Sequence, residues 1–296
     1  MTRRKTTLED KIFDSINYFL LILVTILTIY PFYYIFINSF NEGKDAALGG
    51  IYFWPRKFTL ENYKTFFSDE KWINAFNITL ARTVLGTVIT VFFTCLVAYS
   101  LSHKNLLFRK FYFSAMVFSM YFSGGIITYY VLLRYIHLLD NFLVYIVPMT
   151  IDTFFVLIAV SFFSEIPAEL IESAHLDGAT EMKIFMRIIL PVSMPLIATM
   201  LLFVGVGHWN SWLDSAYYVK SDSLRTLAYR MMEIINQSFT PKDQLTAGIM
   251  NNSGAQATSL SIQLSAMIIA TVPIMCVYPF LQKHFAKGIM LGSVKG

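Results

Sequence analysis

Few side chains of this sequence could carry chemistry, and most of those lie within apolar stretches. Arg82 and Asp152 stand inside long apolar runs, where an ionised group is costly and normally faces a cavity or a partner. Arg82 lies near the start of its run, so its long side chain could instead extend to the interface between lipid and water. Asp152 lies deeper in its run. We therefore expect Asp152 to line a solute pathway or to pair with another helix, and we keep both interpretations for Arg82.

The segment from Trp209 to Trp212 reads Trp-Asn-Ser-Trp at the end of another apolar run. Tryptophans in that position are typical of the aromatic belt at a membrane interface. The belt does not explain Asn210, whose amide could hydrogen-bond a sugar or a neighbouring helix. Trp209 and Asn210 therefore join Arg82 and Asp152 as candidate pathway residues.

Motifs for enzymatic chemistry are absent from the sequence. It has no Gly-x-x-x-x-Gly-Lys-[Ser/Thr] loop, so we expect no ATP to bind to this chain. Cys95 and Cys276 lie in apolar runs without disulfide or metal-site spacing, and no cluster of His, Cys and carboxylate suggests a metal site. We predict a chain with no catalytic residues and with no metal or cofactor of its own.

The composition indicates a membrane protein. Hydrophobic residues make up 56% of the chain and charged residues only 14%, against about 25% charged in soluble domains. The net charge of +4 is spread over the ends of apolar runs, which argues against a nucleic-acid partner. Each run is long enough for the roughly 20 residues of a spanning helix, with local breaks marked by Gly124, Gly125 and Pro148. We predict an all-α polytopic protein with six transmembrane helices, at 16–37, 79–101, 111–133, 142–163, 193–213 and 260–281.

Lysine and arginine in the flanking segments predict the orientation. They occur in the N-terminal tail 1–15, in the loop after 79–101 and in the C-terminal tail 282–296. We place these segments, and so both termini, on the cytoplasmic side of the cell membrane. Segment 38–78 is then an outer loop. Segment 223–239 has apolar residues at helical spacing and is an outer amphipathic helix, which either covers the ends of the spans or contacts a partner protein.

The polar segment 164–192 contains helix signals between two spans. Pro167 suits the first turn of a helix, and Glu169 and Glu172 lie near the positive end of its dipole. Gly178 ends this helix, for which we expect a left-handed conformation. One stripe of the helix would contain Leu170, Ala174 and Asp177.

A second short helix follows in the same segment. Thr180 can cap its start, and we expect it to stop at Leu190, because Pro191 disfavours the helical conformation in the residue before it. The two helices form a hairpin, which the predicted orientation places in the cytoplasm.

The hairpin resembles the EAA loop of type I ABC importer permeases, Glu-Ala-Ala-x-x-Asp-Gly-Ala followed by Ile-x-Leu-Pro. The matching residues are Glu172, Ser173, Ala174, Asp177, Gly178, Ala179, Ile188, Leu190 and Pro191, where Ser173 replaces an alanine. The resemblance implies a MetI-like permease core of five helices over 79–281 and a hairpin at 164–192 that docks on an ATPase. It assigns this coupling to Glu169, Glu172, Ala174, Asp177, Gly178, Ala179 and Pro191.

Two further segments resemble permeases of the carbohydrate type. Residues 54–63, WPRKFTLENY, are similar to their first outer loop, and residues 278–296 are similar to the maltose-type permeases and in particular to the LplC-like branch. In similar permeases this tail enters the interface between the ATPase subunits. The resemblance therefore assigns Gly292, Lys295 and Gly296 to that interface.

These resemblances imply one half of an import channel for an oligosaccharide, working by alternating access. The implied partners are a sibling permease, two ATPase subunits that hold ATP and Mg, and an extracytoplasmic sugar-binding protein. Two alternatives stay open. The cargo could be an amino acid or an ion, or the chain could be a proton-coupled secondary carrier that uses Asp152.

Overall fold

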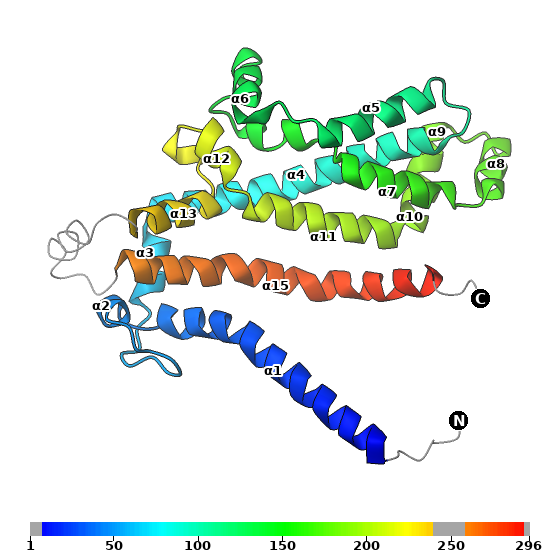
Figure 1. Cartoon of the computed structure of the whole chain (residues 1–296). Helices are drawn as coiled ribbons and strands as arrows, with labels where there is room; N and C mark the ends of the chain where they lie inside the picture. The colour runs from blue at the N-terminus through cyan, green and yellow to red at the C-terminus, as the bar shows by residue number, and fades with distance from the viewer. Residues whose placement is uncertain (1–7, 239–257, 293–296) are drawn as a thin grey trace. The chain divides into compact units, whose positions relative to one another are not determined.

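The computed structural model describes residues 8–238 and 258–292 (Figure 1). Within those ranges the regular elements are helices, and one isolated antiparallel bridge joins Asn41 and Phe58. The predicted all-α class is confirmed. The described residues divide into two compact units with their own internal packing, a first unit of residues 8–69, 236–238 and 258–270 and a second unit of residues 70–235 and 271–292.

Three helical stretches of the described residues are long and apolar enough to cross a membrane by themselves. They are α1 (Leu8–Ser39), α4 (Glu70–Ser102) and the stretch Leu260–Val277 within α15 (Ser259–Gly292). Three more crossings are pairs of helices that bend at a short break, and counting each pair once gives the six predicted spans. The ends differ from those predicted, since α4 starts earlier, at Glu70, and α15 continues into the expected tail.

The expected span 111–133 is not one continuous helix. It is divided into α5 (Arg109–Tyr121) and α6 (Gly125–Tyr135), whose axes meet at 118°. Gly125 has φ +76°, a conformation that a residue with a Cβ adopts rarely, so the glycine permits the change of direction. The local break that Gly124 and Gly125 mark in the sequence is therefore a sharp turn between two helices.

The span expected at 142–163 is also bent. It consists of two short 3₁₀ turns, η1 (Phe142–Tyr145) and η2 (Val147–Met149), followed by α7 (Thr153–Ser164), with a bend of 42°. Pro148 lies within η2, where its missing N–H costs nothing in so short a turn. The chain therefore enters α7 from non-α backbone rather than along a single helix.

The core of the second unit forms where α4 packs against α7 and α11 (Met194–Asn210). Lipid tails are as apolar as leucine, so helices in a membrane associate through close packing and polar contacts rather than through the hydrophobic effect. Small side chains permit such packing here. Cys95 and Ala98 of α4 and Ala159 of α7 are completely buried, and the longer Met200 side chain of α11 is buried as well.

A buried ion pair holds α4 to the segment that follows α11. The Arg82 side chain is 0% exposed, and its guanidinium makes two hydrogen bonds to the Asp214 carboxylate, at 3.0 and 2.5 Å. It also donates to the Ser211 carbonyl at 3.2 Å and lies over the Tyr145 ring, 4.4 Å from the centroid. The interpretation that Arg82 extends to the interface is therefore wrong, because the protein supplies a carboxylate inside.

One end of the second unit is covered by α12 (Leu213–Tyr218), η4 (Asp222–Leu224) and α13 (Leu227–Ser238). α13 occupies the range expected for the amphipathic helix. Its first turn is tied down, because the Leu227 N–H donates to Thr79 Oγ1 of α4 at 2.8 Å. Of the two roles left open for this helix, these contacts favour covering the ends of the spans.

The first unit contains a buried asparagine that organises the outer loop. Asn62, in α3 (Glu61–Ser68), is 0% exposed and donates to the carbonyls of Ser39 and Asn41 at 2.9 and 2.8 Å. The Ser39 hydroxyl in turn bonds the Tyr63 hydroxyl at 2.7 Å. The polar residues of the 54–63 motif thus hold the end of α1 to α3.

Replacing one partner of the Arg82–Asp214 pair should destabilise the protein strongly. We expect Asp214→Leu to cost about 3–5 kcal/mol, because it leaves a buried guanidinium unpaired, whereas the double change Arg82→Leu with Asp214→Leu should be less harmful than either single change. Thermal unfolding of the purified protein in detergent would measure this. As a control, Glu61→Ala removes the exposed pair with Lys64 at 3.4 Å and should cost at most about 1 kcal/mol. A stable Asp214→Leu protein would contradict the assignment.

Candidate functional site

The hairpin predicted at 164–192 is present at the end of the second unit opposite α12 and α13 (Figure 1). Its first helix is α8 (Ala168–Leu176), which Pro167 precedes at the N-cap. The second limb consists of α9 (Glu181–Ile184), a π-helical turn (Phe185–Ile189) and α10 (Leu190–Val192). Ser193 then connects this limb to α11 through a bend of 83°.

The turn between the two limbs explains the spacing of the EAA-like motif. Gly178 has φ +73°, as the sequence predicted, and its N–H donates to the His175 carbonyl at 3.0 Å. The Ala179 N–H donates to the Ala174 carbonyl, also at 3.0 Å, and these two bonds together form a Schellman motif. Ala174 is only 8% exposed, and Ala179 packs on the same core cluster. The small residues and the glycine are therefore required by one compact turn.

The expected stripe of Leu170, Ala174 and Asp177 does not form a common face. Ala174 is buried with Ile171 beside it on the core, whereas Leu170 is 43% exposed and Asp177 is exposed. The reason is that α8 packs on its own chain through Ile171 and Ala174, which are three residues apart. The outward surface of α8 contains Glu169, Glu172, Leu176 and Asp177, of which Leu176 is 90% exposed.

The second limb does not stop at Leu190, contrary to expectation. The wide π turn lets the Leu190 N–H reach the Phe185 carbonyl, and α10 continues through Pro191 to Val192. Pro191 lies in the first turn of α10, where its missing N–H is tolerated. The break comes two residues later, at Ser193, whose N–H bonds back to Ile189 at 3.0 Å.

A carboxylate at the start of the second limb connects the hairpin to the end of α4. The Tyr99 hydroxyl donates to Glu181 Oε2 at 2.7 Å, and Nε2 of His103 and of His175 lie 3.8 and 3.4 Å from the same carboxylate. His103 Nδ1 is 2.8 Å from the Tyr99 carbonyl and must donate to it, so His103 forms an ion pair with Glu181 only when it is protonated. The Glu181 carboxylate thus lies close to side chains of α4 (Tyr99), of the residue after α4 (His103) and of α8 (His175).

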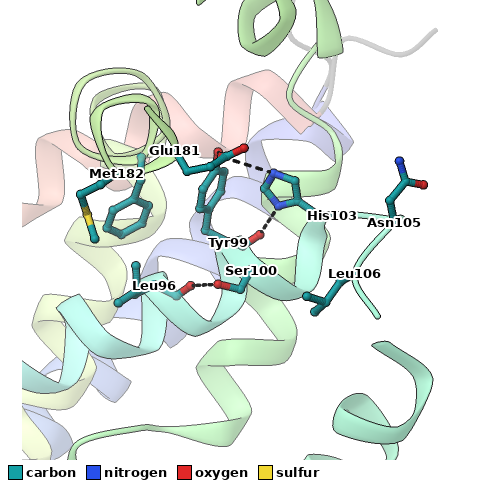
Figure 2. A pocket seen from close by; sticks show the side chains of 9 residues that line it. Leu96, Tyr99, Ser100, His103, Asn105, Leu106, Glu181 and Met182 are labelled. Atoms are coloured by element: carbon teal, nitrogen blue, oxygen red, sulfur yellow. Dashed lines mark hydrogen bonds and ion pairs between the residues drawn. The ribbon is translucent and has the colours of Figure 1, made fainter. Parts of the chain in front are cut away.

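Figure 2 shows Tyr99, His103 and Glu181 side by side in the wall of a pocket of about 390 Å³. The apolar part of its wall includes Leu96, Leu106 and Met182, and Phe185 completes it from the π turn. Phe185 is fully buried and its ring lies 5.5 Å from that of Tyr99. Packing and hydrogen bonding therefore join the second limb to α4 at the same place.

The four candidate pathway residues do not lie together. Asp152 caps α7, since its carboxylate accepts from the Phe155 N–H at 3.1 Å and its own N–H donates to Thr94 at 3.0 Å. It also lines a cavity of about 570 Å³ between α4, α5, α7 and α11. Asp152 therefore lies beside a cavity at the start of a helix, and its role in a solute pathway stays a prediction.

The other three have different surroundings. The Arg82 guanidinium is paired with the Asp214 carboxylate. Trp209 is 6% exposed, and its ring contacts that of Phe76 in α4 edge-on at 6.0 Å, so it packs within the second unit. Asn210 is exposed at the last position of α11. None of these three residues lines the cavity beside Asp152.

Two residues of these sites were missed by the sequence interpretation. Asp214 directly follows the expected span 193–213, and its acidic character next to a span end was the available signal for a partner of Arg82. The other is His208 of α11, which is 2% exposed and lines the same cavity as Asp152. Its burial depends on Gly86 of α4, where a Cβ would lie 2.6 Å from the imidazole.

The expected contact residues of the tail are only partly visible. Gly292 is the last residue of α15, while Lys295 and Gly296 lie outside the described residues. Within residues 8–238 and 258–292, no group of three or more His, Cys, Asp or Glu could hold a metal ion.

Comparison with known proteins identifies the family. LplC of Bacillus subtilis (strain 168) is 38% identical over 290 residues, which cover 98% of this chain and 97% of LplC. YtcP of the same organism, a polygalacturonan/rhamnogalacturonan transport system permease protein, is 32% identical over 289 residues, which cover 98% of this chain and 100% of YtcP.

One solved structure has the same fold over almost the whole chain. A chain of a bacterial ABC transporter involved in the import of the acidic polysaccharide alginate matches with a TM-score of 0.84 at 23% identity, covering 94% of this chain and 98% of that one. No family model matches the sequence. From its identity to these relatives over nearly its full length, the chain belongs to the carbohydrate permeases of ABC importers.

Proposed function

We propose that this chain is one of two permease subunits in an ATP-driven importer that takes up an oligosaccharide. A sibling permease would form the other half of the channel, two ATPase subunits would hold ATP and Mg, and an extracytoplasmic binding protein would deliver the cargo. The hairpin supports this proposal most directly, because α8 is anchored by Ile171 and Ala174 and leaves an acidic surface with one prominent leucine free for a partner.

The names of similar proteins support the cargo class. The printed names of several relatives refer to arabinooligosaccharides, maltodextrin or polygalacturonan/rhamnogalacturonan. A solved relative of the same fold, with a TM-score of 0.55, is described as an alginate transporter in complex with an alginate pentasaccharide-bound periplasmic protein. We extend to this chain the shared feature of these cargoes, a chain of linked sugars.

Force would pass from the ATPases to the spans through α8. Leu176 is 90% exposed and suits an apolar pocket of an ATPase, while Glu169, Glu172 and Asp177 would meet its basic groups. Closure of the ATPase dimer would move α8, and Glu181 would transmit that movement to the cytoplasmic end of α4. The spans would then alternate between inward-open and outward-open states, as in rigid-body switching of packed elements.

The same proposal fixes the orientation in the cell membrane. Both termini and the hairpin lie in the cytoplasm, and the α12 to α13 region faces outward. Gly292, Lys295 and Gly296 would enter the interface between the ATPases, where small residues fit a narrow gap.

Uptake by the reconstituted complex tests this function. The chain would be coproduced with its sibling permease, its ATPases and its binding protein, and the complex placed in liposomes with ATP on the ATPase side. We expect ATP-dependent accumulation of labelled oligosaccharides that requires the binding protein. Accumulation of an amino acid or an ion in place of sugars, or uptake that follows a proton gradient without ATP, would contradict the proposal.

Gly178→Leu should disrupt the coupling between the permease and its ATPases. A left-handed residue with a side chain costs about 1–2 kcal/mol, and relief of that strain would break the Schellman bonds and tilt α8. We expect at least a tenfold loss of uptake and of binding-protein-stimulated ATPase activity, with membrane insertion unchanged. The matched control is Ser173→Ala on the exposed face of α8, which should behave as wild type. Full stimulation in Gly178→Leu would refute the coupling role.

Tyr99 and Glu181 should act as one unit. A hydrogen bond to a charged group contributes about 1.5–3 kcal/mol, less where the carboxylate is partly exposed as here. We expect Tyr99→Phe and Glu181→Leu each to reduce stimulated ATPase activity severalfold, and the double variant to be no worse than the poorer single one. Additive losses in this double-mutant cycle would show that the two residues act separately.

A further inference from the structure

Three consecutive aromatic residues project from the loop between α2 (Gly43–Ala47) and α3 in the first unit. Tyr52, Phe53 and Trp54 are 57%, 68% and 78% exposed. Aromatic side chains carry large apolar surfaces that proteins usually bury, and a contiguous exposed group of them marks a surface for a partner or a membrane. The tip of this loop, Tyr52–Trp54, therefore requires an occupant.

The loop is held on both sides of its tip. Ile51, directly before the tip, is 1% exposed and belongs to the same buried cluster as Ile37 of α1. A few residues after the tip, the Lys57 carbonyl accepts from the Glu42 N–H at 2.9 Å. The three rings are therefore presented in a fixed position relative to the end of α1.

The loop folds back beside α1 (Figure 1). The Tyr33 hydroxyl of α1 donates to the Phe53 carbonyl. Tyr33 lies about 9 Å before the end of α1 at Ser39, since each helical residue rises about 1.5 Å. Residues 15–41 contain no charged residue, so α1 crosses the hydrocarbon within this segment, and Tyr33 lies towards its end. The tip is therefore at the depth where acyl chains meet lipid headgroups.

The two cations that follow the tip are paired within the loop. Arg56 donates to the Asp45 carboxylate at 3.0 Å and to the Gly49 carbonyl at 2.7 Å. Lys57 Nζ lies 3.0 Å from the Glu42 carboxylate. A partner that binds through negative charge would have to compete for these cations. Aromatic rings, in contrast, suit the boundary between headgroups and acyl chains, where Trp and Tyr are enriched.

We propose that the tip Tyr52–Trp54 inserts into the phospholipid bilayer beside α1, at the boundary between headgroups and acyl chains, and anchors the end of α1 there. Tyr52 and Trp54 each combine an apolar ring with one polar atom, which can reach the headgroups while the ring contacts acyl chains. The pairing of Arg56 and Lys57 makes this insertion independent of anionic lipid. The inference concerns the bilayer and goes beyond the importer function and its cargo.

Spin labelling of the assembled transporter in liposomes tests the anchor. Cys276→Ser removes the exposed native thiol, while Cys95 is completely buried and stays. A nitroxide is then attached to Trp54→Cys or, as a matched control, to Lys64→Cys on the exposed face of α3 in the same unit. We expect the label at 54 to collide readily with oxygen, which concentrates in lipid, and severalfold less than the label at 64 with a water-soluble nickel(II) complex.

Phe53→Cys gives a second label position in the tip, and gel filtration identifies the variants that assemble. The same protection should occur in liposomes of phosphatidylcholine alone and in liposomes that also contain phosphatidylglycerol. Ready collision with the nickel complex at 53 and 54 would place the tip in water, and exclusion of both reagents would show that a protein covers it. Either result, or protection only with phosphatidylglycerol, would overturn the proposal and leave the importer function untouched.

Discussion

The buried contact between Arg82 and Asp214 is the constraint on which the end of the second unit formed by α12, η4 and α13 depends. A guanidinium without contact to water needs a carboxylate, a carbonyl and an aromatic face in fixed positions, and these come from Asp214, Ser211 and Tyr145. The Tyr145 hydroxyl then donates to the Leu224 carbonyl at 2.7 Å. One charge on α4 therefore determines where α11 ends, where η1 lies and how α12 and η4 are placed.

The same helix makes contacts at both ends of the second unit. At its C-terminal end α4 contacts the hairpin through Tyr99 and Glu181, and further along it leaves room at Gly86 for His208. Because helices in lipid gain nothing from burying apolar surface against each other, these few polar contacts and small residues define the packing. A displacement of α4 would therefore affect both the contact with the hairpin and the contact with α11.

Local chemistry made part of this structure predictable. Pro167, Gly178 and the acids of the first turn specify the hairpin through interactions within a few residues, and the left-handed Gly178 was expected for that reason. Long apolar runs likewise predicted the spans. The partner of Arg82 could not be found in this way, because 132 residues separate it from Asp214 and only packing brings them together. The burial of His208 depends on a glycine in another helix. The chain continues as a helix past Pro191 because of a π turn, and no residue type in the sequence predicts that turn.

The π turn has a mechanical consequence for the second limb. An α-helix resists bending because each turn is clamped by regular hydrogen bonds, whereas a wide turn followed by a proline and an 83° corner has fewer such clamps. The segment Phe185–Ile189 is therefore the place where the second limb can bend without breaking a regular α-helix. Phe185 of this turn packs on Tyr99 of α4, so a bend here would also change the contact between the hairpin and α4.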